Sequence, residues 1–158
     1  MTALYVVPCG AGKLDQPAFA RDLYTSAHFR FVLTAARAAA GSDDLVRILS
    51  ARHGLIPLAL FLQPYDVTMR DADSISAARI AHQLQLLVGE LDVDQVHALL
   101  PRAYLTRLQD AVELVHQPPY WIGSRTVELV DHYAGARGIG DQRRAASQLG
   151  VAAAGVAL

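Results

Sequence analysis

The stretch Leu4-Tyr5-Val6-Val7-Pro8-Cys9-Gly10-Ala11-Gly12-Lys13 decides the fold of this chain of 158 residues. A short apolar run that opens into a proline and two glycines is typical of a buried parallel strand and the loop at its carboxyl end. Residues 45–49 and 96–100 are mostly apolar runs, each with one polar residue, and each is followed by a loop. The sequence therefore predicts three buried strands, whose following loops begin at Pro8, Ser50 and Pro101.

Helical periodicity separates these strands along the chain. Apolar residues recur at spacings of three and four in residues 29–36, 77–91 and 104–112. Thr25 or Ser26 can cap the first of these helices, and Gly41 would end it. Strands that alternate with helices indicate βαβ units. We predict an α/β fold in which residues 1–158 form a single three-layer domain, with a mainly parallel sheet of about four strands, the fourth at residues 114–116.

The C-terminal third is predicted to be helical. One helix is expected over about residues 124–133 and another from Asp141, with the turn Gly138-Ile139-Gly140 between them. Residues 124–150 would then form a C-terminal helical hairpin.

Composition narrows the class of protein. With 53% hydrophobic residues, 18% charged residues and a net charge of −1, the chain is neither disordered nor a strongly basic nucleic-acid binder. The start has no basic leader and no stretch approaches the roughly 20 apolar residues of a membrane span, so we expect a cytoplasmic protein with no membrane partner. The six histidines show no HxxxH or HxH spacing, and with a single cysteine we expect no metal site and no cofactor.

The basic residues are unevenly chosen. Thirteen are arginine and one, Lys13, is lysine, and the only cysteine, Cys9, lies four residues before it. A lysine retained where arginine is otherwise preferred suggests a need for a compact ammonium group, although chance under a coding bias gives the same count. The amides of Gly10 and Gly12 can form an anion-binding nest beside Lys13. The glycine spacing does not match a Walker A loop, so a nucleoside triphosphatase is not expected.

Cys9 has two readings. At the end of a buried strand it can be a small packed side chain, and beside Lys13 and backbone amides it can be a nucleophile.

Two further clusters contain residues suited to catalysis and binding. Arg21, Asp22 and Tyr24 precede the first helix, where Arg21 and Asp22 form either a polar site or a surface ion pair.

The third cluster follows the second predicted strand. His53 can act as an acid or base, and Tyr65 can stack on a flat ring such as a nucleobase. Ser50 and Arg52 lie beside His53 in the same loop and are expected to bind substrate. Each residue alone is more often a packing residue. Their shared place at the predicted carboxyl edge favours a functional role.

Arginines near the C-terminus suggest a different partner. Arg137, Arg143 and Arg144 flank the Gly138-Ile139-Gly140 turn, and a glycine turn between helices can direct backbone amides at phosphates of DNA or RNA. The alternative is an ordinary helical hairpin with solvated arginines.

The ordered motifs together resemble a small, uncharacterised bacterial and phage domain family. They are residues 7–13, 20–25, 29–30, 49–55 and 64–66. A glycine turn like Gly138-Ile139-Gly140 is common in the C-terminal part of this family, so the resemblance extends over nearly the whole chain. The Pro-Cys-x-x-x-Lys opening and the strand-end Ser-x-x-x-Gly loop are distantly similar to a domain of archaeosine-type tRNA-guanine transglycosylases and to the peroxide-stress protein YaaA. Arg52 departs from the pattern, since lysine is expected before His-Gly. The resemblance implies chemistry or binding at purine-like or 7-deazaguanine bases.

Three functions are compatible with these residues. The first is a nucleotide- or nucleobase-directed enzyme, in which Cys9 or Asp22 attacks and His53 handles the proton, with N-glycosidic cleavage, base exchange or modified-base chemistry as the reaction. The second is a DNA-binding stress-response protein without turnover. The third is a module that senses a nucleotide without changing it.

Overall fold

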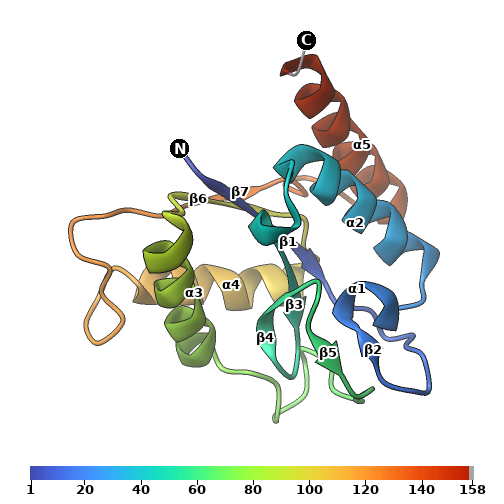
Figure 1. Ribbon diagram of the computed structural model, residues 1–158, viewed down its shortest axis with the longest axis horizontal. Coiled ribbons are helices and arrows are strands. Elements are labelled where there is room, and N and C mark those ends of the chain that lie inside the picture. Colours follow the sequence, from blue (N-terminus) through green and yellow to red (C-terminus); the bar gives the residue numbers. More distant parts are fainter. Residues whose placement is uncertain (157–158) are drawn as a thin grey trace.

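The fold is built on one five-stranded sheet in the order β4–β3–β1–β6–β7 (Figure 1). The computed structural model describes residues 1–156, and the side chains of residues 1–149. The neighbouring strands are parallel except for β3 and β4, which form an antiparallel pair. The strand bounds are β1 (Ala3–Pro8), β3 (Val46–Ser50), β4 (Gly54–Pro57), β6 (Gln95–Ala98) and β7 (Glu128–Asp131). The predicted α/β class with a mainly parallel sheet is confirmed.

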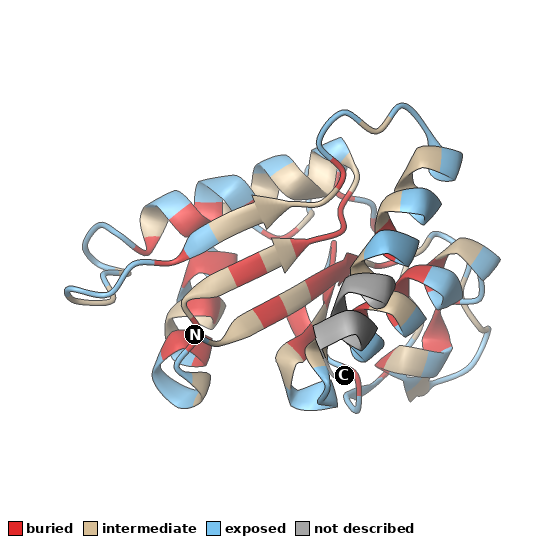
Figure 2. Ribbon diagram, turned by 90° about the horizontal axis from the view of Figure 1, so that it is seen from above, coloured by how far each residue is buried: buried red, intermediate tan, exposed pale blue. Residues whose placement is uncertain are grey.

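Helices cover both faces of the sheet and complete three layers. The helices α2 (Ala27–Ala40) and α5 (Ile139–Val156) pack together on one face, and α3 (Ala77–Leu91) and α4 (Arg102–Leu114) pack together on the other (Figures 1 and 2). The side chain of Ser26 caps α2 by accepting from the Phe29 amide at 3.0 Å, and Gly41, with φ of +73°, ends it as predicted. Among the described residues, none of the helices is both long enough and apolar enough to cross a membrane.

The buried core lies between the sheet and these helices. Val6, Ile48 and Val96, one from each of three adjacent strands, are completely buried, as are Ile80 and Leu84 of α3. Burial of such side chains, each worth roughly 1.5–3 kcal/mol, holds the strand ends in fixed positions. Figure 2 shows the buried residues concentrated along the central strands.

Four short elements complete the fold. They are a four-residue helix, a two-stranded antiparallel sheet and a 3₁₀ turn that leads into the amino end of β3: α1 (Ala20–Leu23), β2 (Ala18–Phe19), β5 (Phe61–Leu62) and η1 (Asp43–Leu45). The rings of Phe19 and Phe61 meet edge to face across β2 and β5, with centroids 5.5 Å apart.

The strand order places a switch point between β1 and β6. From β1 the chain runs through α2 to β3 on one side, and it then passes through α3 on the opposite face to reach β6. In open α/β sheets a ligand binds in the crevice at the carboxyl ends of the strands where the order reverses. This crevice lies between Cys9, which follows β1, and the start of α4, which follows β6.

Two of the predicted elements are wrong. Residues 124–133 contain no helix, because Glu128–Asp131 form β7, which pairs in parallel with β6. The predicted helical hairpin over residues 124–150 is therefore absent, and α5 alone forms the helical end. Thr126, Val127 and Val130 are β-branched, which favours an extended backbone. The open edge of β6 gives the backbone of Glu128–Asp131 the hydrogen-bond partners that an isolated helix would have to supply itself. Residues 114–116 end α4 and begin a turn, so the fourth parallel strand is β7.

Candidate active site

Cys9 lies at the switch point and contacts the other side of the crevice. Its amide donates a hydrogen bond to the Leu49 carbonyl at 3.1 Å, which fixes the residue to the end of β3. Its Sγ lies 3.2 Å from the Oη of Tyr104, in the first turn of α4. Cys9 is only 8% exposed. Burial raises the pKa of Tyr104, so this phenol stays protonated and can donate a hydrogen bond to the sulfur.

Three hydroxyl groups form a chain beside Cys9. Ser50 donates to the Tyr65 oxygen at 2.7 Å, and the Oη atoms of Tyr65 and Tyr24 are 2.6 Å apart. The Ser50 oxygen accepts from the amides of Arg52 and His53 at 3.2 and 3.0 Å. Only one proton can lie between the two phenol oxygens. One phenolic O–H therefore remains without an acceptor in the described structure and can donate to a ligand.

Burial keeps the phenols of Tyr24 and Tyr65 neutral. It raises the pKa of Tyr24 and of Tyr65 far above the ordinary value, and the neighbouring Cys9 raises both further. The pair therefore offers hydrogen bonds rather than negative charge.

Lys13 lies against these tyrosines. Its Nζ is 4.5 Å from the ring centroid of Tyr65 and 5.8 Å from that of Tyr24, and its protein acceptor is the Ala11 carbonyl at 3.4 Å. A cation on the face of an aromatic ring is held in place while its N–H groups stay free for an anion. The sequence prediction of Lys13 as an anion-binding group fits this position.

The glycine loop is held close to the next segment. The Thr25 amide donates to the Gly12 carbonyl at 3.0 Å, and a Cβ at Gly12 would lie 2.9 Å from the Thr25 Oγ1, so only glycine fits without movement. Within the described part of the chain, no acceptor takes a hydrogen bond from the amides of Gly10, Ala11 or Gly12. These amides remain available to an anion beside Lys13.

A basic cavity adjoins the tyrosines. It has a volume of about 360 Å³ and is lined by Arg52, His53, Val67, Asp73 and Arg79. The His53 ring meets the edge of Tyr65, with centroids 5.3 Å apart and planes at 89°. Burial, and then the charges of Arg52 and Arg79, lower the pKa of His53, so its imidazole is neutral at pH 7. The cavity thus combines two guanidinium groups and a neutral imidazole with one carboxylate, that of Asp73. The two positive charges exceed the single negative charge, which favours a phosphate or carboxylate as ligand.

The loop under this cavity is clamped by Gln83 of α3. The Gln83 amide donates to the His53 carbonyl at 2.8 Å, and its oxygen accepts from the Leu55 amide at 2.8 Å. Gly54, between them, has φ of +80°. The clamp fixes the position of His53 relative to Tyr65.

Arg21 and Asp22 lie apart from this cluster. They pair with each other at 3.8 Å on α1, and Arg21 stacks over the Phe19 ring at 4.8 Å. The Asp22 side chain is 62% exposed, and among the described residues its only ion pair is with Arg21. The structure does not bring Asp22 to Cys9, and its catalytic role stays a prediction.

Two of the three C-terminal arginines have side-chain partners within the protein. Arg144 pairs with Asp141 at 3.4 Å, and the guanidinium of Arg143 lies 5.7 Å from the centroid of Phe31. The Asp141 carboxylate also accepts from the Arg137 amide at 3.0 Å, so a carboxylate already occupies the start of α5, where a phosphate would bind. Nucleic-acid binding through this segment stays a prediction.

Two residues of the site were missed. Tyr104 and Arg79 belong to helices, and the apolar spacing of each helix gave no reason to separate them from their neighbours. The rule on strand ends did select the loop that begins at Pro101, three residues before Tyr104. No signal in the sequence indicates Arg79, because its place depends on how α3 packs against the loop after β3.

Two histidines that share no sequence motif meet where β6 and β7 lie side by side. The Nδ1 of His97 on β6 lies 2.8 Å from the Nε2 of His132, which follows β7, and the His97 ring also stacks on Tyr5. Burial lowers the pKa of both histidines, and the neighbouring charge of His132 lowers that of His97 further. One proton can bridge the two nitrogens, whereas two would repel each other. Within the described residues no three His, Cys, Asp or Glu side chains are placed to hold a metal ion.

We expect this pair to make the protein less stable in acid. A histidine whose pKa is lowered on folding binds protons less well in the native state, so unfolding takes up protons once the pH falls below about 6.5. Between pH 7.5 and 5.5, the His132→Asn variant should therefore lose less stability than the wild type, as measured by chemical denaturation. His28 and His53 also have lowered pKa values and are present in both proteins, so the difference isolates the pair. Equal losses of stability in the wild type and the variant would show that the His97–His132 pair does not cause the sensitivity to acid.

Comparisons with known proteins match this chain to a family whose function is unknown. Residues 4–118 match the model of DUF6884, described as a family of unknown function. No curated protein and no solved structure matches the chain. The expected resemblance to an uncharacterised family is confirmed, and nothing in these comparisons supports the more distant similarity to tRNA-guanine transglycosylases or to YaaA.

Proposed function

Because the chain belongs to DUF6884, a family of unknown function, we propose its activity from the site itself: it is an enzyme that binds a nucleotide or nucleobase at the switch point and attacks it with Cys9. The observation that carries this proposal is the position of Cys9. Its sulfur lies 3.2 Å from the Tyr104 phenol and is near enough to Tyr24 and Tyr65 to raise the pKa of both. Lys13, the only lysine of the chain, lies over the rings of these two tyrosines. A nucleophile, a proton donor and a cation in one crevice are the parts that nucleophilic catalysis requires.

The charges around the crevice favour an anionic ligand. Lys13, Arg52 and Arg79 provide three cations, and the glycine-loop amides provide free donors. A mononucleotide fits this arrangement, with its phosphate in the basic cavity or on the loop and its base toward Cys9. One face of the Tyr65 ring already carries the Lys13 ammonium, so we infer that Tyr65 contributes through its hydroxyl and through Lys13 more than by stacking.

The sulfur suits addition to an electrophilic carbon such as a nitrile on a 7-deazapurine. In this step the Cys9 Sγ bonds to the nitrile carbon and one π-electron pair of the C≡N bond moves to the nitrogen. The nitrogen gains a proton from the Tyr104 hydroxyl, which takes up the thiol proton in turn. The product is a thioimidate that contains every atom of both reactants. N-glycosidic cleavage by Asp22 is less well supported, because that carboxylate is exposed and paired with Arg21.

Titration with purine mononucleotides tests the binding half of the proposal. We expect wild-type protein to bind GMP or AMP, and Lys13→Met to bind it about tenfold more weakly, since a charge-assisted hydrogen bond is lost. The matched control is Arg30→Met, which removes one positive charge from an exposed position on α2. Isothermal titration calorimetry gives the Kd values. Equal weakening in both variants, or no binding of either nucleotide, would contradict the proposal.

A further inference from the structure

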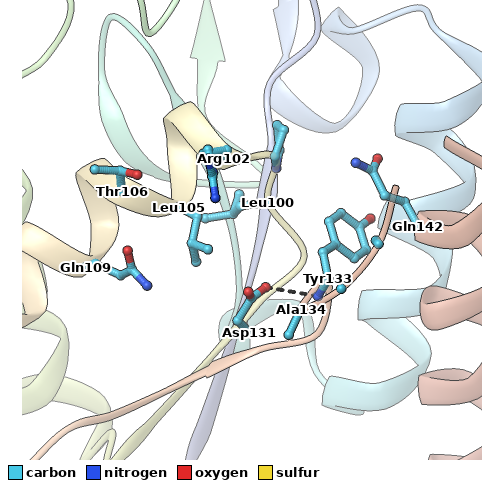
Figure 3. Close-up of a pocket in the computed structure, with 12 residues that line it drawn as sticks. Leu100, Arg102, Leu105, Thr106, Gln109, Asp131, Tyr133, Ala134 and Gln142 are labelled. Atoms are coloured by element: carbon cyan, nitrogen blue, oxygen red, sulfur yellow. Dashed lines mark hydrogen bonds between the residues drawn. The ribbon is translucent and has the colours of Figure 1, made fainter. Parts of the chain in front are cut away.

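A second and larger cavity opens at the carboxyl ends of β6 and β7. Its volume is about 630 Å³, and its walls come from the start of α4, from the loop after β7 and from the start of α5 (Figure 3). None of the residues that line it belongs to the Cys9 site. The lining residues that decide its chemistry are Pro101, Arg102, Asp131, Tyr133 and Gln142.

One end of this cavity is positive. The helix α4, of 13 residues, begins here at Arg102, and Pro101 at its N-cap offers no side chain to accept from the first amides. In the described structure, the first amide of α4 with a backbone acceptor is that of Leu105, which donates to the Pro101 carbonyl at 2.9 Å. The free amides and the aligned peptide dipoles favour an anion, and the Arg102 guanidinium adds a full charge.

The other end holds a buried hydroxyl without a partner. Tyr133 is 7% exposed, and its Oη has no hydrogen-bond partner among the described residues. Figure 3 shows this hydroxyl turned toward Gln142, whose amide also lines the cavity. Burial raises the pKa of Tyr133 to about 12, so the group is a neutral donor and acceptor at pH 7. A buried hydroxyl without a partner costs free energy, which a bound ligand would recover.

Asp131 sets the polarity of the cavity. One carboxylate oxygen accepts from the Tyr133 amide at 2.9 Å (Figure 3), and the other is free to accept from a ligand. A carboxylate repels an anion, so the charged group of a ligand belongs at the Arg102 end. The Asp131 end suits neutral groups that donate hydrogen bonds, such as hydroxyls.

We propose that this cavity is a second ligand site, which binds a small phosphate ester bearing hydroxyl groups, such as a sugar phosphate. The phosphate lies on the α4 N-terminus and Arg102, and the hydroxyls lie between Asp131, Tyr133 and Gln142. The site is separate from the Cys9 crevice and stands whether or not Cys9 is a nucleophile.

Ribose 5-phosphate, inorganic phosphate and ribose are the probes that test this site by calorimetry. We expect ribose 5-phosphate to bind more tightly than either fragment. Arg102→Met and Tyr133→Phe should each weaken its binding about tenfold, whereas Cys9→Ser and Lys13→Met should leave it unchanged. The proposal is overturned if ribose 5-phosphate does not bind to the wild type. It is also overturned if Arg102→Met and Tyr133→Phe both bind ribose 5-phosphate as tightly as the wild type does. It is also overturned if Lys13→Met abolishes binding, since the ligand would then occupy the Cys9 site.

Thermal unfolding of Tyr133→Phe without ligand provides the second readout. The hydroxyl has no protein partner, so its removal should leave the Tm equal to or above that of the wild type while ligand binding weakens. A lower Tm in the unliganded variant would assign the hydroxyl a structural role and overturn the proposal.

Discussion

Cys9→Ser is expected to abolish formation of a covalent adduct with 7-cyano-7-deazaguanine. Intact-mass spectrometry of the wild type should show a gain equal to the mass of the probe, since addition to the nitrile loses no atoms. Replacing sulfur with a hydroxyl, a far weaker nucleophile near neutral pH, should reduce the adduct by about 100-fold or more. The chain has no other cysteine, so no second thiol contributes background.

The Tyr104→Phe variant separates the role of Tyr104 as a proton donor from the intrinsic nucleophilicity of the Cys9 thiol. It removes the hydroxyl 3.2 Å from the sulfur and keeps the ring. If Tyr104 relays the proton, this variant should form the adduct about tenfold or more slowly, yet react normally with a small alkylating reagent that needs no proton donor. An adduct that forms equally well in Cys9→Ser would show that Cys9 is a packing residue and refute its proposed role.

Gly54→Ala is expected to cause a large loss of stability. The residue has φ of +80°, and an added Cβ would collide with the Gln83 side-chain oxygen and lie 2.6 Å from the Ile75 Cδ1. The clash breaks the clamp that holds both sides of the turn, so backbone strain and lost hydrogen bonds add together. We expect the free energy of unfolding in urea to fall by about 3 kcal/mol or more.

Gly41→Ala is the matched control for this effect. Gly41 has a similar φ of +73° at the end of α2, but an added Cβ there would have open space around it. It should lose only the cost of a left-handed conformation, about 1 kcal/mol. Equal losses at the two glycines would mean that the Gln83 clamp contributes nothing.

Much of the fold follows from local patterns in the sequence. The apolar run before Cys9 is long enough for one strand and is cut by a proline, so its type and its end are both predictable. The same holds for α2, whose cap at Ser26 and stop at Gly41 are in the sequence. The strand β7 is different, because residues 124–133 fit either period. The free edge of β6 decides between them, and this edge exists only in the folded sheet.

The residues of the candidate site also fall into two groups, those that local sequence patterns predict and those that depend on tertiary packing. Cys9, Lys13, Ser50 and His53 were predictable because the ends of neighbouring parallel strands must meet at one edge. Tyr104 and Arg79 were not, because their roles depend on which side of a helix faces the crevice. The pairing of His97 with His132 likewise depends on β7 lying beside β6. Local pattern thus locates the edge, and tertiary packing selects the side chains around it.

Because of its position, Lys13 can carry a spectroscopic label that reports ligand binding in the crevice. Reductive methylation with labelled formaldehyde would place carbon-13 on two kinds of amine in this chain, the Lys13 side chain and the N-terminus. The ammonium lies 4.5 Å from the Tyr65 centroid, so the ring current of the phenol shifts its methyl resonance. A ligand that draws the amine off the ring removes that shift. Occupancy of the crevice can therefore be followed by one nuclear magnetic resonance signal, and the only groups added there are methyls on the Lys13 amine, which keeps its positive charge.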